Sequence, residues 1–118
     1  MTRKMAEQRG HWGERRAALW LRLKGWRIVG QRVRVAQGEV DIIARRGRTL
    51  AFIEVKTRKN AADLDTAIDA YRLRRVAAAA QALVHKYARA SESIRIDVIL
   101  IAPGAWPRHL KNVWMETQ

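Results

Sequence analysis

The sequence predicts an α/β fold, a mixed β-sheet flanked by helices, in the order helix, three strands, helix, strand and a short edge strand. Segments 5–24 and 64–89 carry apolar residues at helical spacing, whereas the other runs are rich in Val and Ile. Three successive strands form a meander, and one helix then crosses over to the next strand. With 118 residues and no internal repeat, we expect one domain over 1–118.

The first helix is expected over 5–24, because apolar residues recur there at helical spacing and Gly25 then ends the helix. Its apolar stripe consists of Trp12, Leu19, Leu23 and the alanines between them. A strand over 26–35 follows. Val33 and Val35 alternate with arginines, which predicts one buried and one exposed face.

The stretch from Gly38 to Arg58 is typical of a β-hairpin, because two runs rich in Val, Ile and Phe flank an Arg- and Gly-containing turn. Strands buried on both faces are normally apolar throughout. These two runs instead carry four charged residues, namely Glu39, Asp41, Glu54 and Lys56. Side chains two residues apart share one face of a strand, so each run places its two charges on one face.

The pairing of the two strands decides which acids meet. A two-residue turn at Arg46-Gly47 places Glu39 opposite Glu54, whereas a four-residue turn places Asp41 opposite Glu54. Either register gathers the four charges on one face. That face continues toward the turn with residues on which a helix can pack: Ile43, Leu50 and Phe52. The other, apolar face is expected to hold Val40, Ile42, Ala51, Ile53 and Val55.

Carboxylates this close together repel one another unless a cation lies among them. Oxygen ligands without cysteine favour a hard ion, Mg²⁺ or Mn²⁺, over zinc. With Lys56 beside it, such a site can activate water and stabilise charge on a phosphate, which is the chemistry of phosphodiester cleavage. The alternative is a salt-bridge ladder on a solvated face, in which Lys56 pairs with Glu54 or Glu39.

Asp41, followed by Glu54-Val55-Lys56, resembles the PD-(D/E)xK signature of restriction-endonuclease-like nucleases. The fuller pattern is similar to the YraN family of small bacterial predicted nucleases, which are themselves similar to archaeal Holliday junction resolvases. Its parts occur in order along the chain: Gly13-Glu14, Gly38-Glu39-Val40-Asp41, 52–58, 74–79, Ile96-Asp97-Val98 and Trp106-Pro107-Arg108-His109. The resemblance implies a restriction-endonuclease-like core.

The resemblance also implies a metal site. Asp41 and Glu54 would hold Mg²⁺ or Mn²⁺ together with the backbone carbonyl of Val55, and Glu14 would reach the ion from the first helix. From spacing alone, Glu14 is equally an ordinary partner for an arginine on its own helix. The predicted metal ligands are therefore Asp41, Glu54 and Glu14.

Two other residues take supporting roles in the same reading. Lys56 would orient or help deprotonate the attacking water and offset charge on the phosphorane, while Glu39 would lie behind the ligands as an outer acid. Junction or flap DNA as the substrate follows only from the similarity to resolvases. A homodimer that cuts two strands is likewise expected by analogy alone.

The second helix is expected over 64–89, after an N-cap at Asp63 or Asp65. Its buried stripe consists of Leu73, Val76, Ala80, Leu83 and Tyr87. A strand over 94–101 follows, in which Asp97 is expected to pair with Arg95 or another arginine rather than to bind metal.

A loop marked by two prolines leads from this strand to a short edge strand over 110–115. Three ring-bearing residues in this region form either an aromatic lid or cover for the core: Trp106, His109 and Trp114. The sequence offers no catalytic or metal-binding pair for His109.

A formal net charge of +13 and a pI near 11.5 favour a polyanionic partner, nucleic acid above all, although an Arg- and Ala-rich composition also arises in GC-rich genomes. Arginine suits phosphate because its donors form a planar fork. The residues expected to bind backbone phosphates are Arg45, Arg46, Arg58, Arg72 and Arg75.

The chain has no cysteine and no apolar run of the roughly 20 residues that cross a membrane, and its N-terminus does not read as a secretory signal. We therefore expect a cytoplasmic protein. A DNA-cleaving, Mg²⁺-dependent enzyme is the first hypothesis. The alternatives are a non-catalytic nucleic-acid-binding protein and a small basic module that docks on an acidic protein. The acids favour the enzyme, because carboxylates repel DNA unless a metal neutralises them.

Overall fold

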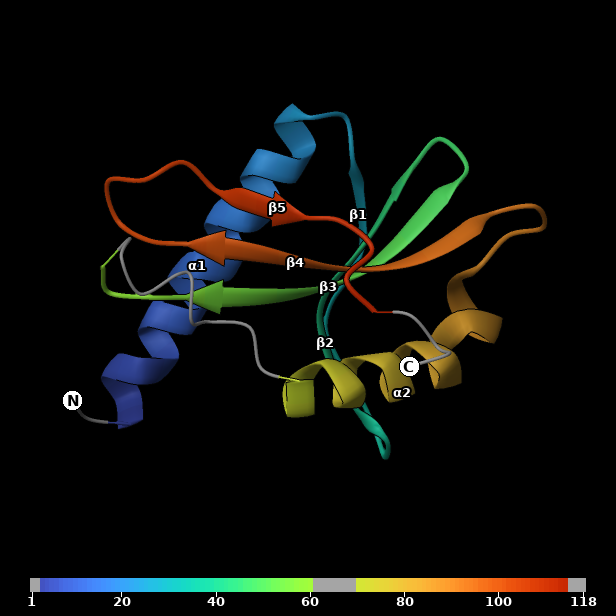
Figure 1. The fold of residues 1–118 in the computed structure, drawn as a ribbon, viewed down its shortest axis with the longest axis horizontal. Coiled ribbons are helices and arrows are strands. Elements are labelled where there is room, and N and C mark those ends of the chain that lie inside the picture. The colour runs from blue at the N-terminus through green and yellow to red at the C-terminus, as the bar shows by residue number, and fades with distance from the viewer. Residues whose placement is uncertain (1–2, 61–69, 115–118) are drawn as a thin grey trace.

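The structure, a computed structural model, describes residues 3–60 and 70–114. Two helices and five strands follow one another in the predicted order (Figure 1). Their bounds are α1 Arg3–Leu23, β1 Arg27–Val35, β2 Gly38–Arg46, β3 Thr49–Thr57, α2 Ala70–Tyr87, β4 Ser93–Ile101 and β5 Arg108–Leu110. The beginning of the second predicted helix, with its N-cap at Asp63 or Asp65, lies outside the described residues.

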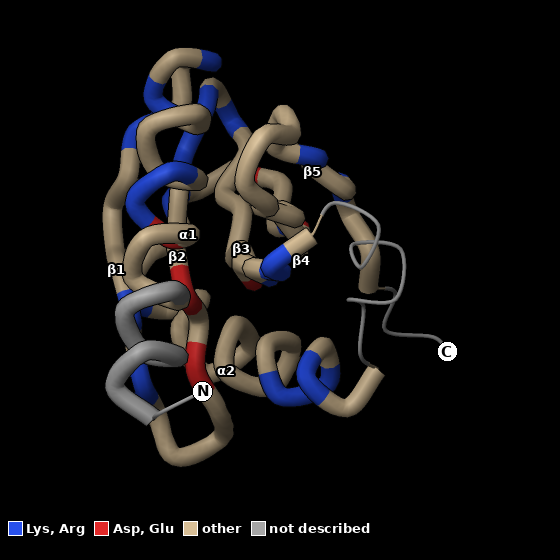
Figure 2. The backbone as a smooth tube through the Cα atoms, turned by 90° about the vertical axis from the view of Figure 1, so that its left-hand side faces the viewer, with Lys and Arg blue, Asp and Glu red and all other residues tan. Residues whose placement is uncertain are grey.

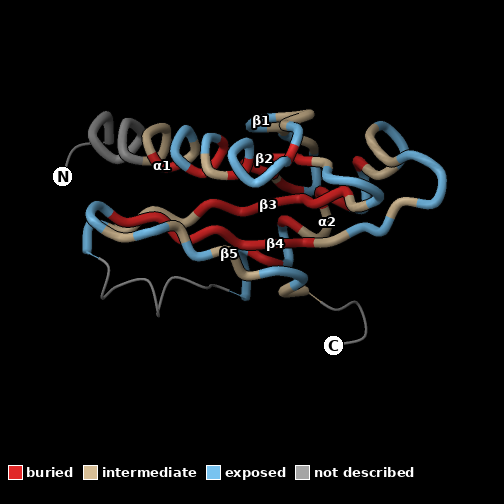
Figure 3. Tube along the Cα trace, turned by 90° about the horizontal axis from the view of Figure 1, so that it is seen from above, coloured by how far each residue is buried: buried red, intermediate tan, exposed pale blue. Residues whose placement is uncertain are grey.

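The five strands form one sheet in the order β1-β2-β3-β4-β5. The pairs β1–β2, β2–β3 and β4–β5 are antiparallel and β3–β4 is parallel, so the sheet is mixed as predicted. In Figure 1, α1 runs behind the strands, whereas α2 lies below β3 and β4 and crosses in front of β2. Each helix covers one face of the sheet, and β3 and β4 are buried between them over much of their length (Figure 3). In the described part of the chain, neither helix is long and apolar enough to span a membrane.

The helix α1 packs on the sheet through small residues. Ala17, Ala18 and Leu21 are buried against a strand face formed by Ile42, Ala44, Ala51, Ile53 and Val55. The predicted stripe through Leu19 and Leu23 is wrong, since these side chains are 56% and 76% exposed. The alanines prevail because they allow the helix to approach the sheet closely, which bulky leucines at the same positions would prevent.

The helix α2 covers the other face as predicted. Leu73, Val76, Ala80 and Leu83 are buried and Tyr87 is half-buried, while the strand residues Ile43, Leu50 and Phe52 pack beneath this helix. Val40 also packs on this side, although alternation predicted it beside Ile42 on the α1 side. At Val40 the strand β2 is paired only with β1, and two-stranded ribbons twist more strongly than wider sheets, which accounts for the change of face.

The hairpin between β2 and β3 has the register in which Asp41 stands opposite Glu54. The ladder runs from Arg46↔Thr49 to Ile42↔Ile53, and the two acids are the next residues beyond it. The turn itself has two residues, Gly47 and Arg48, rather than the four expected for this register. Gly47 has a φ of 58°, a left-handed conformation that glycine adopts without steric cost.

The edge strand β5 is earlier and shorter than the predicted 110–115 strand. It pairs with β4 from Val98↔Leu110 to Leu100↔Arg108. The chain leaves the ladder after Leu110 because Asn112 takes a positive φ of 53° and its N–H turns inward to Asp97.

Candidate active site

The acidic residues lie where β2 separates from β3. The Oδ2 atom of Asp41 accepts a hydrogen bond of 2.8 Å from the backbone N–H of Val55, which has lost its neighbour on that side. Beyond this point β3 is paired only with the parallel strand β4. Figure 2 shows acidic segments along β2 as it passes between the two helices. The fork therefore opens a polar site inside an otherwise apolar sheet.

Glu54 is the most buried acid of the site and has two cationic partners. Its Oε1 lies 2.9 Å from a guanidinium nitrogen of Arg72 on α2 and 3.4 Å from Nζ of Lys56. The charge of Glu54, with smaller contributions from Asp41 and Glu39, raises the pKa of Arg72. Glu54 is 1% exposed and Arg72 is half-exposed, so the buried carboxylate is compensated from the surface.

Among the residues that the structure describes, no cation forms an ion pair with Asp41. Burial raises the pKa of Asp41 to about 8, and the negative charges of Glu54 and Glu14 add to the rise against the opposing hydrogen bond from Val55. At neutral pH this carboxyl group is therefore protonated unless a further positive charge arrives. A pKa raised by burial beside like charges is typical of functional sites.

Glu14 approaches the site from α1 because that helix lies very close to β3. A Cβ atom added at Gly13 would lie 1.9 Å from Oγ1 of Thr57, so only glycine fits at this crossing. Glu14 pairs at 2.9 Å with Arg32 of β1, a residue with a positive φ of 49°, rather than with any of the described arginine side chains of its own helix. Its charge still reaches Asp41.

Glu39 lies further out than the other acids. It pairs with Arg34 at 3.2 Å and its side chain is 37% exposed, so it borders the site from the rim of β2. The structure thus brings Asp41, Glu54 and Lys56 together, with Glu14 and Glu39 at the margins. Among the described residues, no group of three or more His, Cys, Asp or Glu side chains is close enough to hold a metal ion. Two inner carboxylates remain, which is a donor set that suits Mg²⁺, because this ion keeps several waters and takes substrate oxygens.

The arginines expected to bind phosphate fall into different environments. The prediction that Arg45 binds phosphate is corrected by the structure. The guanidinium of Arg45 is mostly buried and donates hydrogen bonds to Glu92 and to the carbonyl of Tyr87, so it is not available to a ligand. Sequence reasoning missed this because Glu92 is distant along the chain. Arg72 is turned toward Glu54, so it belongs to the acid site itself.

The remaining three arginines lie nearer the surface. Arg46 stacks over Trp26 with 4.7 Å from its central carbon to the ring centroid. Arg58 is half-buried and donates to the carbonyl of Thr57, next to the proposed site. Arg75 is exposed on α2. Arg58 therefore lies near the acids, whereas Arg46 lies at the turn end of the hairpin, away from the fork.

Asp97 has the structural surroundings that the sequence predicted. It is fully buried and bonded to Arg95 at 2.8 Å, to Nε2 of His109 at 2.7 Å and to the backbone N–H of Asn112 at 2.8 Å. Burial opposes ionisation, but the hydrogen bonds from His109, Arg95 and Asn112 outweigh it and hold the pKa of Asp97 below its ordinary value. His109 is thus a structural partner, which no local pattern in the sequence signals.

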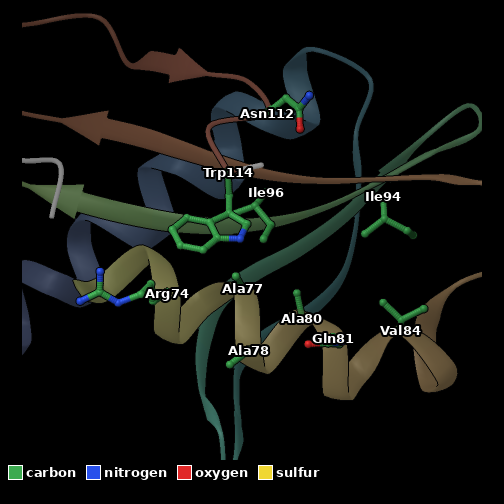
Figure 4. A pocket seen from close by; sticks show the side chains of 10 residues that line it. All are labelled: Arg74, Ala77, Ala78, Ala80, Gln81, Val84, Ile94, Ile96, Asn112 and Trp114. Atoms are coloured by element: carbon green, nitrogen blue, oxygen red, sulfur yellow. The ribbon is translucent and has the colours of Figure 1, made fainter. Parts of the chain in front are cut away.

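Two pockets on the described surface lie away from the acids. The first, of about 610 Å³, lies between α2 and β4, where Trp114 projects over Ile96 and Arg74 stands at one end (Figure 4). It contains none of the predicted site residues. The second lies between α1 and the loop from β4 to β5. Trp114 packs against the core, whereas Trp106 is 86% exposed. Of the two readings for these rings, core cover applies to Trp114.

A family model described as "Uncharacterised protein family UPF0102" matches residues 13–101, which include the whole acid site. The chain belongs to the UPF0102 family. UPF0102 proteins of Sphingopyxis alaskensis, Rhizorhabdus wittichii and Erythrobacter litoralis are 68%, 65% and 60% identical to it, each over at least 95% of both chains. This confirms the resemblance carried by the motifs.

Among solved structures, Hjc of Archaeoglobus fulgidus, titled a Holliday junction resolvase, matches this UPF0102 chain with a TM-score of 0.55. The match covers 83% of this chain and 72% of Hjc, at 23% sequence identity. It shows that the UPF0102 chain has the restriction-endonuclease-like fold expected from its sequence.

Proposed function

We propose that this chain is a metal-dependent nuclease that hydrolyses phosphodiester bonds in DNA. The observation that carries the proposal is the convergence of Asp41, Glu54 and Lys56 at the fork of β2 and β3. Two buried acids and a lysine meet there, in a fold shared with a protein titled a Holliday junction resolvase. Asp41 also accepts the hydrogen bond of Val55, but that bond lowers the pKa of Asp41, and the rise to about 8 comes from burial beside Glu54 and Glu14.

Asp41 and Glu54 are the proposed ligands of a Mg²⁺ or Mn²⁺ ion, with the carbonyl of Val55 as a third donor. The N–H and C=O of one strand residue point to the same side, so this carbonyl faces the strand edge that Asp41 closes. The raised pKa of Asp41 supports the assignment, because a cation would relieve the repulsion that causes part of the rise. When bound, such an ion supplies positive charge for the phosphate and lowers the pKa of a coordinated water.

The chain's own residues then perform the remaining tasks. Lys56, 3.4 Å from Glu54 and largely buried, is held with its ammonium group toward the site, where it orients the attacking water and offsets charge on the phosphorane. The water oxygen forms a bond to phosphorus as the ester P–O bond breaks. Arg72 is half-exposed beside Glu54 and can turn its free donors to a phosphate oxygen. Glu14 acts on Asp41 through its charge rather than as an inner ligand, and Glu39 remains at the rim, paired with Arg34.

The basic surface supplies affinity for the polyanion. A net charge of +13 with exposed arginines such as Arg75 binds backbone phosphates without reading base sequence. Branched DNA is the first substrate to test, and a homodimer the expected assembly, because the solved structure of similar fold is titled a Holliday junction resolvase. Both points rest on analogy of fold.

A non-catalytic nucleic-acid-binding protein is the second candidate. The observation that favours it is the pairing of Glu54 with both Arg72 and Lys56, which compensates the most buried acid without metal. This candidate predicts salt-sensitive binding that does not change when Mg²⁺ is removed.

The test is cleavage of labelled substrates in the presence of Mg²⁺ or Mn²⁺. The DNA substrates are a four-way junction, a flap, a single strand and a duplex, and a structured RNA is included for comparison. Wild type is compared with Asp41→Asn and Lys56→Ala, and Glu39→Gln at the rim of the site is the control. Metal-dependent cleavage that both inner variants lose while they still bind substrate would establish the nuclease. Tight binding without cleavage of any substrate would reject it in favour of the binding protein.

A further inference from the structure

We propose that a groove between α1 and the loop from β4 to β5 is a docking site for an acidic, apolar segment of a partner protein. This α1–loop groove has a volume of about 360 Å³. It is lined by Arg16, Leu19, Trp20, Leu23 and residues 101–107. The proposal is independent of the nuclease assignment, because the groove contains none of the acids of the fork.

Exposed apolar side chains concentrate at this groove. Five large hydrophobic residues are exposed in the described part of the chain, and three of them line it. Leu19 is 56% exposed, Leu23 is 76% exposed and Trp106 is 86% exposed. Contiguous exposed apolar surface of this kind marks interaction sites, because leaving it in water is unfavourable. The two leucines are one helical turn apart, so they form a short ridge along α1 with Trp106 across from it.

The floor of the groove is held in place from inside. The ring of Trp20 packs edge-on to His109, with 5.4 Å between the ring centroids. His109 is in turn bonded to the fully buried Asp97 at 2.7 Å. An aromatic floor anchored on a buried carboxylate keeps its shape without a partner, which reduces the entropy lost on binding.

The charge around the groove selects the partner's chemistry. Arg16 is the charged residue in the lining, and Arg15 and Arg22 of α1 and Lys24 just after it add positive charge, without an acid between residues 15 and 24. A second copy of this chain would bring the same apolar ridge with the same positive rim and a net charge of +13. A segment with Asp or Glu beside large apolar residues satisfies both the rim and the floor.

Aliphatic ridge residues favour a protein over a nucleic acid at this place. Bases bind by stacking on exposed aromatic rings and gain little from Leu19 and Leu23. Of the two tryptophans in the lining, Trp20 is half-buried and packs on His109, whereas Trp106 is 86% exposed. Apolar anchors from a peptide helix or strand bury against such leucines directly. The exposed leucines therefore decide between the two kinds of ligand.

The groove and the acid site use different sides of α1. Glu14, Ala18 and Leu21 follow helical spacing on the side that faces the sheet, whereas the groove takes residues at 16, 19, 20 and 23. Variants at the groove should therefore leave the proposed catalytic residues in place. The surface can be tested without disturbing the fork.

The experiment selects random dodecapeptides displayed on phage against the full-length wild type, with Trp106→Ser as the counter-selection target. We expect enrichment of peptides that combine Asp or Glu with Leu, Phe or Trp. The consensus peptide, labelled and titrated by fluorescence anisotropy, should bind at least tenfold more weakly to Leu23→Ser and Trp106→Ser. Tyr71→Ser, which alters an exposed aromatic residue on α2, is the matched control and should bind like wild type.

Three results would overturn the proposal. One is the absence of an enriched consensus, or unchanged binding when its acids are replaced by amides. Another is loss of single-stranded DNA binding by Trp106→Ser with peptide binding intact, which would assign the ring to a nucleic acid. The last is a wild-type dimer, seen by sedimentation, that Leu23→Ser converts to monomer, which would assign the groove to a second copy.

Discussion

The backbone N–H of Val55 donates a 2.8 Å hydrogen bond to Oδ2 of Asp41 at the point where β2 leaves β3. The carboxyl group of Asp41 thus accepts the bond that a strand neighbour would otherwise take. Its protonation state is coupled to the energetics of the fold, because the group is buried and lies near two other acids. The proposed chemistry is therefore open to measurement through stability as well as through activity.

The metal-free protein should lose stability as the pH rises. Burial, with the charges of Glu54 and Glu14, raises the pKa of Asp41 from 3.8 to about 8. Between these values the unfolded chain releases the proton that the folded chain keeps, so the free energy of unfolding falls with increasing pH. Asp41→Asn has no such proton, and its urea-unfolding curves across this range should show a much smaller pH slope. Equal slopes in the two proteins would contradict the raised pKa.

Added Mg²⁺ or Mn²⁺ should raise the melting temperature of wild type more at pH 8 than in acid, because carboxylates bind metal only after losing their protons. A free metal concentration one hundred times Kd should raise the free energy of unfolding by about 2.7 kcal/mol. Asp41→Asn and Glu54→Gln should lose most of this shift. Glu39→Gln, altered at an exposed pair with Arg34, is the control and should keep it. A shift retained in all variants would place the metal elsewhere.

Arg72→Ala should increase the affinity for Mn²⁺. Arg72 lies 2.9 Å from Glu54 and presents a positive charge that a metal ion must oppose. It is half-exposed, so the gain should correspond to no more than about 1 kcal/mol, or roughly fivefold in Kd. Calorimetric titration measures it, with Arg75→Ala on the same helix as the control. Weaker binding by Arg72→Ala would show instead that this arginine holds Glu54 in position.

Gly13→Ala should destabilise the protein by about 1–3 kcal/mol, because the new methyl group would lie 1.9 Å from Oγ1 of Thr57 and push α1 away from β3. Gly10→Ala on the same helix meets nothing within 4 Å and should be stabilising by about 0.5–1 kcal/mol. Thermal unfolding of both variants tests the contrast. Combining Gly13→Ala with Thr57→Ala should recover part of the loss, and a neutral Gly13→Ala would refute the close approach.

Asp97→Asn should cost about 3–5 kcal/mol, since it breaks a buried ionic network and leaves Arg95 without its carboxylate. The hydrogen bonds from His109, Arg95 and Asn112 outweigh burial and lower the pKa of Asp97, so wild type should also lose stability as the pH falls through that pKa. Urea unfolding of the variant, compared with wild type in acid and at neutral pH, measures both effects. If Asp97→Asn lowered the free energy of unfolding by less than about 1 kcal/mol, the network would not depend on the carboxylate, and water would be compensating for the lost bonds.

The order of the elements was predictable because it depends on local periodicity. Period-two alternation also predicted that Asp41 shares a face with Glu39 and that Glu54 shares one with Lys56. The 3.4 Å pair of Glu54 and Lys56 agrees with this prediction, whereas Val40 departs from the alternation in β2. The stripe of α2 follows from spacing in the same way, as Leu73, Val76, Ala80 and Leu83 show. The buried stripe of α1 could not be predicted from spacing, because the side that is buried depends on how closely Gly13 and the alanines allow the helix to approach the sheet.

The sequence by itself thus determined the family, the order of helices and strands, and the residues able to form an acid site. Only the tertiary structure decided the register that sets Asp41 opposite Glu54, the fork that leaves the N–H of Val55 to Asp41, and the partners of individual charges. Arg45 is taken by Glu92 and Arg72 by Glu54, each from a distant part of the chain. Such pairs depend on which surfaces meet when the sheet and helices pack, and that packing energy is not encoded in any short run of residues.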